Sequence, residues 1–172
     1  MKTNSATARR GVLAHLEQMA LRVGQKAPDF DVTSSSGQRV RLSEFLGKKN
    51  VVLYFYPGDF TPVCTRETCG FRDSYAELAS KDTEVVGVSI DSDQSHERFA
   101  KQYEVPFALV SDSARILSTS YEAMSLFSRL TGKVGRITYV IDKKGDIAGV
   151  FDSELRASKH VDGVRDLVRK LG

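Results

Sequence analysis

The sequence predicts one α/β domain, built on a mixed β-sheet with helices on both faces. Two observations carry this prediction. Residues 51–56 and 85–90 are apolar, β-rich runs without polar alternation, which is typical of strands buried on both sides in the middle of a sheet. Helical stretches alternate with such strands along the chain. A length of 172 residues fits a single domain.

The N-terminal part is interpreted as an extension followed by a β-hairpin. Within residues 1–22, several apolar side chains are spaced for one side of a helix, so this extension is expected to dock on the domain. They are Val12, Leu13, Leu16, Met19 and Ala20. The domain itself is expected over residues 23–172. Its first two strands, 30–33 and 38–41, flank a turn of serine and glycine and predict a leading hairpin.

The rest of the chain alternates between strands and helices. The expected elements are a helical turn at 42–47, strands at 51–56, 85–90 and 107–110, helices at 65–81, 95–103 and 113–121, an antiparallel hairpin of 135–141 and 147–151, and a closing helix at 158–171. This order requires a mixed sheet, and a thioredoxin-like topology is the natural choice. The chemistry of such sheets gathers beyond the carboxyl ends of the parallel strands, where the loop 57–64 must lie.

Charge and hydropathy exclude several classes of function. The 25 basic and 22 acidic residues give a net charge of +3 without a basic block, so nucleic-acid binding has no support. No stretch approaches the roughly 20 apolar residues that cross a bilayer, and the N-terminus lacks the apolar region of a secretory signal. We therefore expect a soluble protein with no membrane partner.

The cysteine count bears on the compartment. Two cysteines are too few for a secreted disulfide scaffold, which favours a compartment with reduced thiols, hence the cytoplasm. An organelle is the alternative, because Lys2, Arg9 and Arg10 precede the first acidic residue among several serines and threonines, as in some transit peptides.

Both cysteines directly follow the predicted central strand. Cys64 lies at the start of a helix, where free N–H groups and the positive end of the dipole favour a thiolate, and Pro62 fits a helix beginning. The N–H groups of Val63 and Cys64 can hold an incoming oxygen. The Thr61 hydroxyl can accept from one atom and donate to another. The loop therefore combines a reactive thiol with donors for an oxygen atom.

Two other interpretations of Cys64 remain open from the residues alone. A free cysteine is often only a small buried apolar residue. Two thiolates could also supply half of a tetrahedral zinc shell, which His96 or His160 would have to complete, but neither histidine has a spacing that suggests it. We expect neither a metal nor a cofactor.

At these residues the chain resembles a peroxiredoxin, because Pro57, Thr61 and Cys64 reproduce the family's proline-x-x-x-threonine-x-x-cysteine motif. The five-residue step from Cys64 to Cys69 further resembles the atypical two-cysteine members of the bacterioferritin-comigratory, or Q-type, subfamily. The resemblance extends from about residue 23 to the C-terminus.

The resemblance implies a fold, an activity and roles for particular residues. It implies a thioredoxin fold, a peroxidatic Cys64, a resolving Cys69, an Arg136 whose guanidinium approaches the thiolate, and a Glu67 that orients the arginine. The implied partners are a hydroperoxide substrate and thioredoxin or a similar dithiol donor, and the implied state is a monomer. Without the resemblance, Arg136 is interpreted as a solvated arginine at the start of an exposed hairpin strand.

The expected function is a thiol peroxidase. The Cys64 thiolate becomes a sulfenic acid, condenses with Cys69, and the disulfide is reopened by the dithiol donor. In an intact helix, a five-residue step rises about 7.5 Å and turns about 500°, whereas disulfide Cα atoms lie about 4.4–6.8 Å apart. The helix must therefore unwind locally, and Gly70 lowers its helical propensity.

Two other functions use the same cysteines. A general thiol-disulfide oxidoreductase is disfavoured, because such enzymes usually pair cysteines across two intervening residues. A redox sensor or interaction module that uses the same disulfide without catalysis is the second alternative.

Overall fold

The computed structural model describes residues 20–124 and 131–172. The elements in chain order are β1 (Asp31–Thr33), β2 (Arg39–Arg41), α2 (Leu42–Phe45), β3 (Asn50–Phe55), α3 (Pro62–Ser80), β4 (Thr83–Ser89), α4 (Asp93–Tyr103), β5 (Ala108–Ser111), α5 (Ile116–Ser120), β6 (Ile137–Ile141), β7 (Ile147–Asp152) and α7 (Ala157–Leu171). The helix expected within the N-terminal extension lies, up to residue 19, outside the described residues. None of the described helices is long and apolar enough to span a bilayer.

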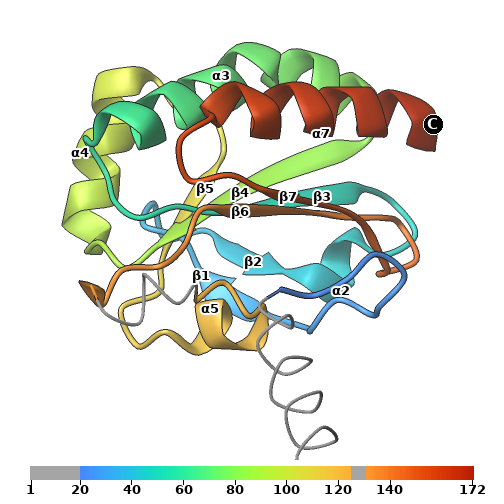
Figure 1. Ribbon diagram of the computed structural model, residues 1–172, viewed down its shortest axis with the longest axis horizontal. Helices are drawn as coiled ribbons and strands as arrows, with labels where there is room; N and C mark the ends of the chain where they lie inside the picture. The colour runs from blue at the N-terminus through green and yellow to red at the C-terminus, as the bar shows by residue number, and fades with distance from the viewer. Residues whose placement is uncertain (1–19, 125–130) are drawn as a thin grey trace, which may run out of the picture.

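Five strands form one mixed sheet in the order β5-β4-β3-β6-β7. The strands β3, β4 and β5 are parallel, whereas β6 is antiparallel to β3 and β7 is antiparallel to β6. Helices α3, α4 and α7 cover one face, and the hairpin β1–β2 lies with α2 and α5 on the other (Figure 1). The predicted α/β class, with helices on both faces and a leading hairpin, is confirmed.

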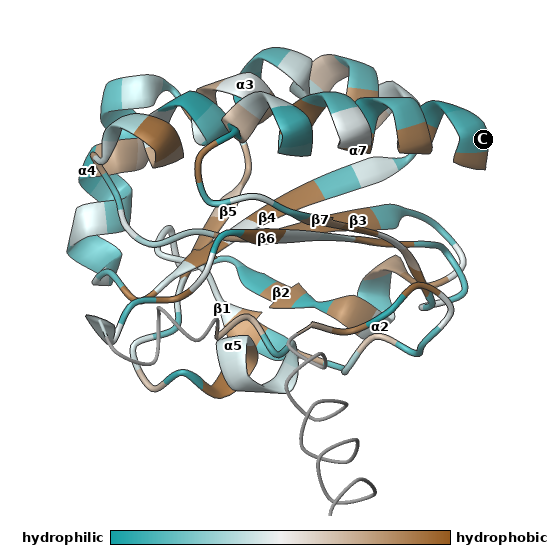
Figure 2. Ribbon diagram, viewed as in Figure 1, coloured by the Kyte–Doolittle hydropathy of each residue, from teal (hydrophilic) through white to brown (hydrophobic). Residues whose placement is uncertain are grey.

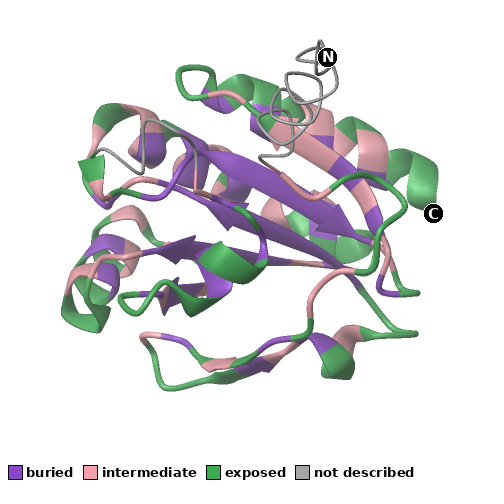
Figure 3. Cartoon of the chain, turned by 60° about the horizontal axis from the view of Figure 1, so that its bottom comes forward, coloured by how far each residue is buried: buried purple, intermediate pink, exposed green. Residues whose placement is uncertain are grey.

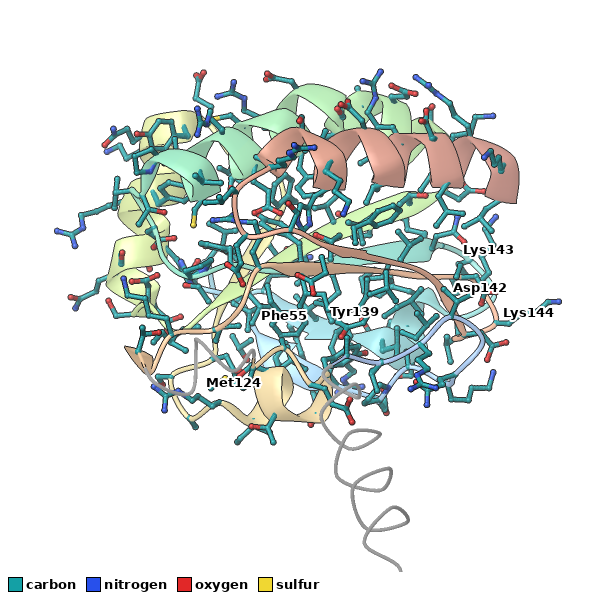
Figure 4. All side chains as sticks on the ribbon, viewed as in Figure 1. Phe55, Met124, Tyr139, Asp142, Lys143 and Lys144 are labelled. Atoms are coloured by element: carbon teal, nitrogen blue, oxygen red, sulfur yellow. The ribbon has the colours of Figure 1, made fainter. Side chains whose placement is uncertain are left out.

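The core consists of two apolar layers, one on each face of this sheet. Side chains of β3 alternate between them: Tyr54 joins the layer under α3 and α7, and Phe55 joins the opposite layer. Phe55 and Tyr139 both lie in that opposite layer, below the sheet in Figure 4. The central strands β3, β4 and β6 are accordingly mostly apolar and buried, as Figures 2 and 3 show for the middle of the sheet, while the helices expose their outer sides. Strand β3 is buried on both faces, as its sequence predicted.

Two helices, α3 and α5, each begin three residues away from the predicted start. Helix α3 begins at Pro62 rather than at residue 65, because proline fits the first helical position, where no N–H is needed. Cys64 is therefore the third residue of the helix. Helix α5 begins only at Ile116 rather than at residue 113, because Arg115 has a φ of +55° and cannot continue a helix from before it.

The carboxyl end of β3 lies at the same end of the sheet as the starts of α3, β6 and α7 (Figure 1). Helices α3 and α7 pack closely there, since a Cβ on Gly70 would lie 2.8 Å from Val161 Cγ2. Gly70 is therefore required by helix packing, in addition to its effect on helical propensity. This end of the sheet brings together residues from four distant parts of the chain.

Candidate active site

The loop between β3 and α3 is anchored by a buried carboxylate, Asp59. It accepts hydrogen bonds from the Tyr56 hydroxyl at 2.8 Å, from the Ser95 hydroxyl at 2.8 Å and from His96 Nδ1 at 2.9 Å. Burial raises the pKa of Asp59. The hydrogen bond and charge of His96, together with the hydrogen bonds from the two hydroxyls, lower it by more, so the pKa lies below its ordinary value. The charged carboxylate ties the loop to the start of α4.

A second aspartate fixes the backbone of the same loop. Asp91 Oδ2 accepts from the Asp59 N–H at 2.9 Å and from the Ser89 hydroxyl at 2.7 Å. Phe60 follows in the left-handed region, with a φ of 60°, and its ring packs edge-on against Phe99 at 5.2 Å. A non-glycine residue in this region persists only where its surroundings hold it. The loop therefore presents Thr61 and Cys64 in one fixed arrangement.

Cys64 is a free thiol with no exposed surface. It lies in the first turn of α3, where backbone N–H groups have no partner within the helix and the dipole favours a negative charge. Thr61 is the residue before this helix, and its hydroxyl donates to the Gly58 carbonyl at 3.1 Å. Its lone pairs are thus left to accept a hydrogen bond from a ligand.

Arg136 lies directly against this thiol. Its Nη2 donates to Cys64 Sγ at 3.1 Å, its Nη1 donates to Glu67 Oε2, and its Nε donates to the Glu154 carbonyl at 3.1 Å. Burial lowers the pKa of Arg136, but the charges of Glu67 and Cys64 raise it above its ordinary value. The interpretation as a solvated arginine is wrong, because Arg136 is only 3% exposed.

Glu67 and His160 lie behind the guanidinium. Glu67 is fully buried, and this burial raises its pKa to about 7 although Arg136 lowers it. His160 Nδ1 lies 3.4 Å from Glu67 Oε1, and the Thr138 hydroxyl lies 2.9 Å from the same nitrogen. Burial lowers the pKa of His160 to about 4. The structure thus brings Cys64, Arg136, Glu67 and His160 into one chain of contacts.

Cys69 is not brought to Cys64 in this arrangement. It is also a free thiol, half-buried, and lies within the same continuous helix α3. A five-residue step along an intact helix separates two side chains by about 140° around the axis. The two cysteines therefore need a change in α3 before they can bond.

The described residues offer no second cluster of ligand groups beside the thiol. Within them, no three His, Cys, Asp or Glu side chains gather as a metal would require. A depression of about 460 Å³ lies between α3 and the start of α7, lined by Arg66, Gly70, Leu155 and Arg156 among others. It contains neither cysteine. The polar groups beside Cys64 are thus those of the loop and of Arg136.

The sequence did not point to two parts of this site. From the sequence, His96 and His160 are candidates only for a zinc shell, and Asp59 is only a residue of the loop. Their partners are distant along the chain: Asp59 and His96 are 37 residues apart, and Thr138 and His160 are 22 apart. No local pattern in the sequence could have paired them.

Comparisons with known proteins show which family the chain is similar to. The AhpC/TSA family model matches residues 23–150. "Peroxiredoxin Q, chloroplastic" from Sedum lineare is 42% identical over 149 residues, which cover 86% of this chain and 78% of that protein. "Putative peroxiredoxin bcp" from Coxiella burnetii is 38% identical over 146 residues, covering 83% and 95%. The crystal structure of peroxidoxin BcpB from Mycobacterium tuberculosis superposes with a TM-score of 0.80 at 31% identity, covering 88% of this chain and 99% of that one.

Proposed function

Since this chain belongs to the AhpC/TSA family and is a homologue of the peroxiredoxin Q and bcp thiol peroxidases, we propose that Cys64 is the thiol that reduces hydroperoxides and that Cys69 resolves its oxidised form. The observation that carries this proposal is the buried contact at 3.1 Å between Arg136 Nη2 and Cys64 Sγ. A fixed guanidinium favours the thiolate, which is the nucleophilic form of cysteine.

In the first step, the thiolate of Cys64 attacks one oxygen of the peroxide. The O–O bond breaks, the sulfur is oxidised to a sulfenic acid, and the departing oxygen leaves as water or an alcohol after taking up a proton. Arg136 and the N–H groups at the start of α3 stabilise the charge on the departing oxygen. The Thr61 hydroxyl donates to Gly58, so it orients the peroxide by accepting a hydrogen bond. Pro57 lies two residues after the end of β3 and directs the chain into this loop.

In the second step, the Cys69 thiol condenses with the sulfenic acid. An S–S bond forms, the S–O bond breaks and water is released. Because α3 is continuous across both cysteines, this step requires the first turns of α3 to unwind. Thioredoxin or a similar dithiol then reduces the disulfide by exchange, and a monomer suffices for the cycle.

The cysteines and the relatives of this chain bear on the compartment in which the protein works. The chain has two cysteines, too few for the disulfide scaffold of a small secreted protein, which favours a compartment that keeps thiols reduced. The cytoplasm fits this condition, and the chloroplastic relative keeps an organelle as the alternative.

The proposal is tested by hydroperoxide consumption with a thioredoxin system. Cys64→Ser should abolish turnover, because a serine hydroxyl is not ionised at neutral pH. Cys69→Ser should react once and then stop as a sulfenic or over-oxidised cysteine. Turnover near the wild-type rate in Cys64→Ser would contradict the assignment. Disulfide exchange without peroxide consumption would instead support a thiol-disulfide oxidoreductase, and oxidation without turnover would support a sensor.

A further inference from the structure

One carboxyl oxygen of Glu67, which lies behind the Cys64 thiol, has no hydrogen bond among the residues that the structure describes. Glu67 Oε2 accepts from Arg136, whereas the buried Glu67 Oε1 has no such partner and faces His160 Nδ1 at 3.4 Å. A buried polar atom left without a hydrogen bond destabilises the folded state, and more so if it is charged. The position of His160 therefore calls for an explanation beyond packing.

The hydrogen bonds of His160 determine which of its nitrogens carries a proton. Its Nε2 lies 3.0 Å from the Ser153 carbonyl, which can only accept, so Nε2 donates. In the neutral ring, Nδ1 then presents a lone pair to the Thr138 hydroxyl and to Glu67 Oε1. A lone pair and a carboxylate oxygen repel each other unless a proton lies between them.

We propose that His160 and Glu67 share one proton and that His160 thereby acts as a positioning residue, which keeps the charge of Arg136 directed at the Cys64 thiolate. With the proton in place, Glu67, His160 and Arg136 together carry a net charge of +1, whether the proton lies on the carboxyl group or on the imidazole. The guanidinium charge is then not cancelled by these two partners. Without the proton, the Glu67 carboxylate pairs with Arg136 and competes with the thiolate for the same cation.

The pKa values agree with one shared proton. Burial raises the pKa of Glu67 to about 7 and lowers that of His160 to about 4, so the pair holds one proton between these values. Such values belong to the pair rather than to either residue.

Other charged or titratable groups face the pair from every element around it. They are Tyr54 on β3, Arg136 before β6, Glu154 after β7 and Lys159 on α7. The Cys64 thiol on α3 contacts Arg136. Burial raises the pKa of Tyr54 well above its ordinary value, so it stays neutral. The charge of Glu154 raises the pKa of Glu67, and those of Arg136 and Lys159 lower the pKa of His160. Glu154 and Lys159 thus both favour placing the proton on Glu67.

The proposal rests on the peroxidase function proposed above, and a pair of substitutions tests it. His160→Gln can keep a donor for the Ser153 carbonyl but has no ionisable nitrogen beside Glu67. The Thr138 hydroxyl is then free to donate to Glu67 Oε1, which favours the carboxylate. Glu67→Gln mimics the protonated acid whatever residue stands at 160. Val164→Ala, a buried apolar change on the same helix, is the control for lost packing.

The readout is the pH at which the second-order rate with hydrogen peroxide reaches half of its plateau. We expect His160→Gln to raise this midpoint by about one pH unit, because an opposite charge within hydrogen-bond reach shifts a titration by about one to three units. Val164→Ala should lower the melting temperature and leave the midpoint unchanged. The double variant Glu67→Gln/His160→Gln should return the midpoint to that of Glu67→Gln. The proposal is overturned if the midpoint is unchanged in His160→Gln. It is also overturned if the double variant differs from Glu67→Gln by the same shift that His160→Gln shows relative to the wild type.

If His160→Gln fails to fold, titration of the His160 imidazole in the wild-type protein tests the same proposal. The ¹⁵N resonances of His160 should show a transition with a midpoint near that of Glu67, about 7, and this transition should be absent in Glu67→Gln. Identical titration of His160 in both proteins overturns the proposal. This result does not depend on turnover, so a failure of the peroxidase assignment, seen as an active Cys64→Ser, is distinguishable from a failure of the shared proton.

Discussion

The Arg136 guanidinium donates a hydrogen bond to the sulfur of Cys64 over 3.1 Å, although 72 residues separate the two along the chain. The contact is made at the end of the sheet where β3 leads into α3 and β6 begins beside it. Arg136 also pairs with Glu67, so a single buried cation faces both the thiol and a carboxyl group. This shared cation and the helix that carries both cysteines determine how the protein should respond to substitution and to oxidation.

Replacing Arg136 separates its effect on rate from its effect on stability. Arg136→Met should slow peroxide reduction by about 100-fold or more, as expected when one donor to a developing charge is lost. It should also destabilise the fold by about 3–5 kcal/mol, because it leaves Glu67 buried without its cation. Arg136→Met/Glu67→Gln should recover part of the stability and none of the rate. An unchanged second-order rate in either variant would remove Arg136 from the reaction.

The pH dependence of stability reports on Glu67. Its folded-state pKa of about 7 lies above its ordinary value of 4.5, so the folded state binds more protons than the unfolded state between these values. The contribution of Glu67 to stability is therefore lost as the pH rises through this window. Relative to the wild type, Glu67→Gln should gain stability between pH 4.5 and 7, by at most about 1.4 kcal/mol per unit. Denaturant unfolding at several pH values checks this. A constant difference would contradict the raised pKa.

Asp59 should matter for both the loop and the fold. Asp59→Ala removes the acceptor for Tyr56, Ser95 and His96, and donors left unsatisfied in the interior cost about 1–3 kcal/mol each. We expect a loss of stability together with slower peroxide reduction, because the loop before Cys64 is released. The matched control is Asp93→Ala, which replaces an exposed aspartate on α4, the helix that Asp59 contacts, and it should change stability by no more than about 0.5 kcal/mol. Normal rates in Asp59→Ala would show that the loop keeps its shape without this anchor.

The start of helix α3 should open during the cycle. A Cys64–Cys69 disulfide cannot coexist with a regular helix, so the amides of residues 65–71 should lose hydrogen-exchange protection after oxidation. The close packing of Gly70 against Val161 opposes this opening in the reduced protein. Hydrogen exchange on reduced and peroxide-treated protein measures both states. Strong, equal protection in the two, with the disulfide confirmed by mass, would exclude unwinding while leaving the peroxidase assignment intact.

The sequence predicted those features that depend on neighbouring residues. Apolar runs predicted the central strands, and Pro62 before Cys64 predicted a thiol at a helix start, because hydrophobic periodicity and helix-start signals act over a few residues. The burial of Arg136 could not be predicted in this way. It depends on β6 lying between β3 and β7 rather than at an exposed edge, and on Glu67 of helix α3, which pairs with Arg136.

The polar contacts that hold the site together could not be predicted from the sequence either. The Asp59–His96 and Glu67–His160 contacts each join a residue of the cysteine loop or helix to a histidine on a distant helix. Nothing near His96 or His160 in the sequence distinguishes a hydrogen-bonded core histidine from a metal ligand. Only the packing of α4 and α7 on the sheet determines which partners the two rings meet.

Intact mass after one equivalent of hydrogen peroxide tests the central claim most directly. The wild-type protein should lose the mass of two hydrogens and retain no oxygen, and peptide mapping should join Cys64 to Cys69. Cys69→Ser should instead gain oxygen on Cys64, and Cys64→Ser should not change. A wild-type protein that retains oxygen with Cys69 still free, or one whose mass does not change, would contradict the two-cysteine peroxidase.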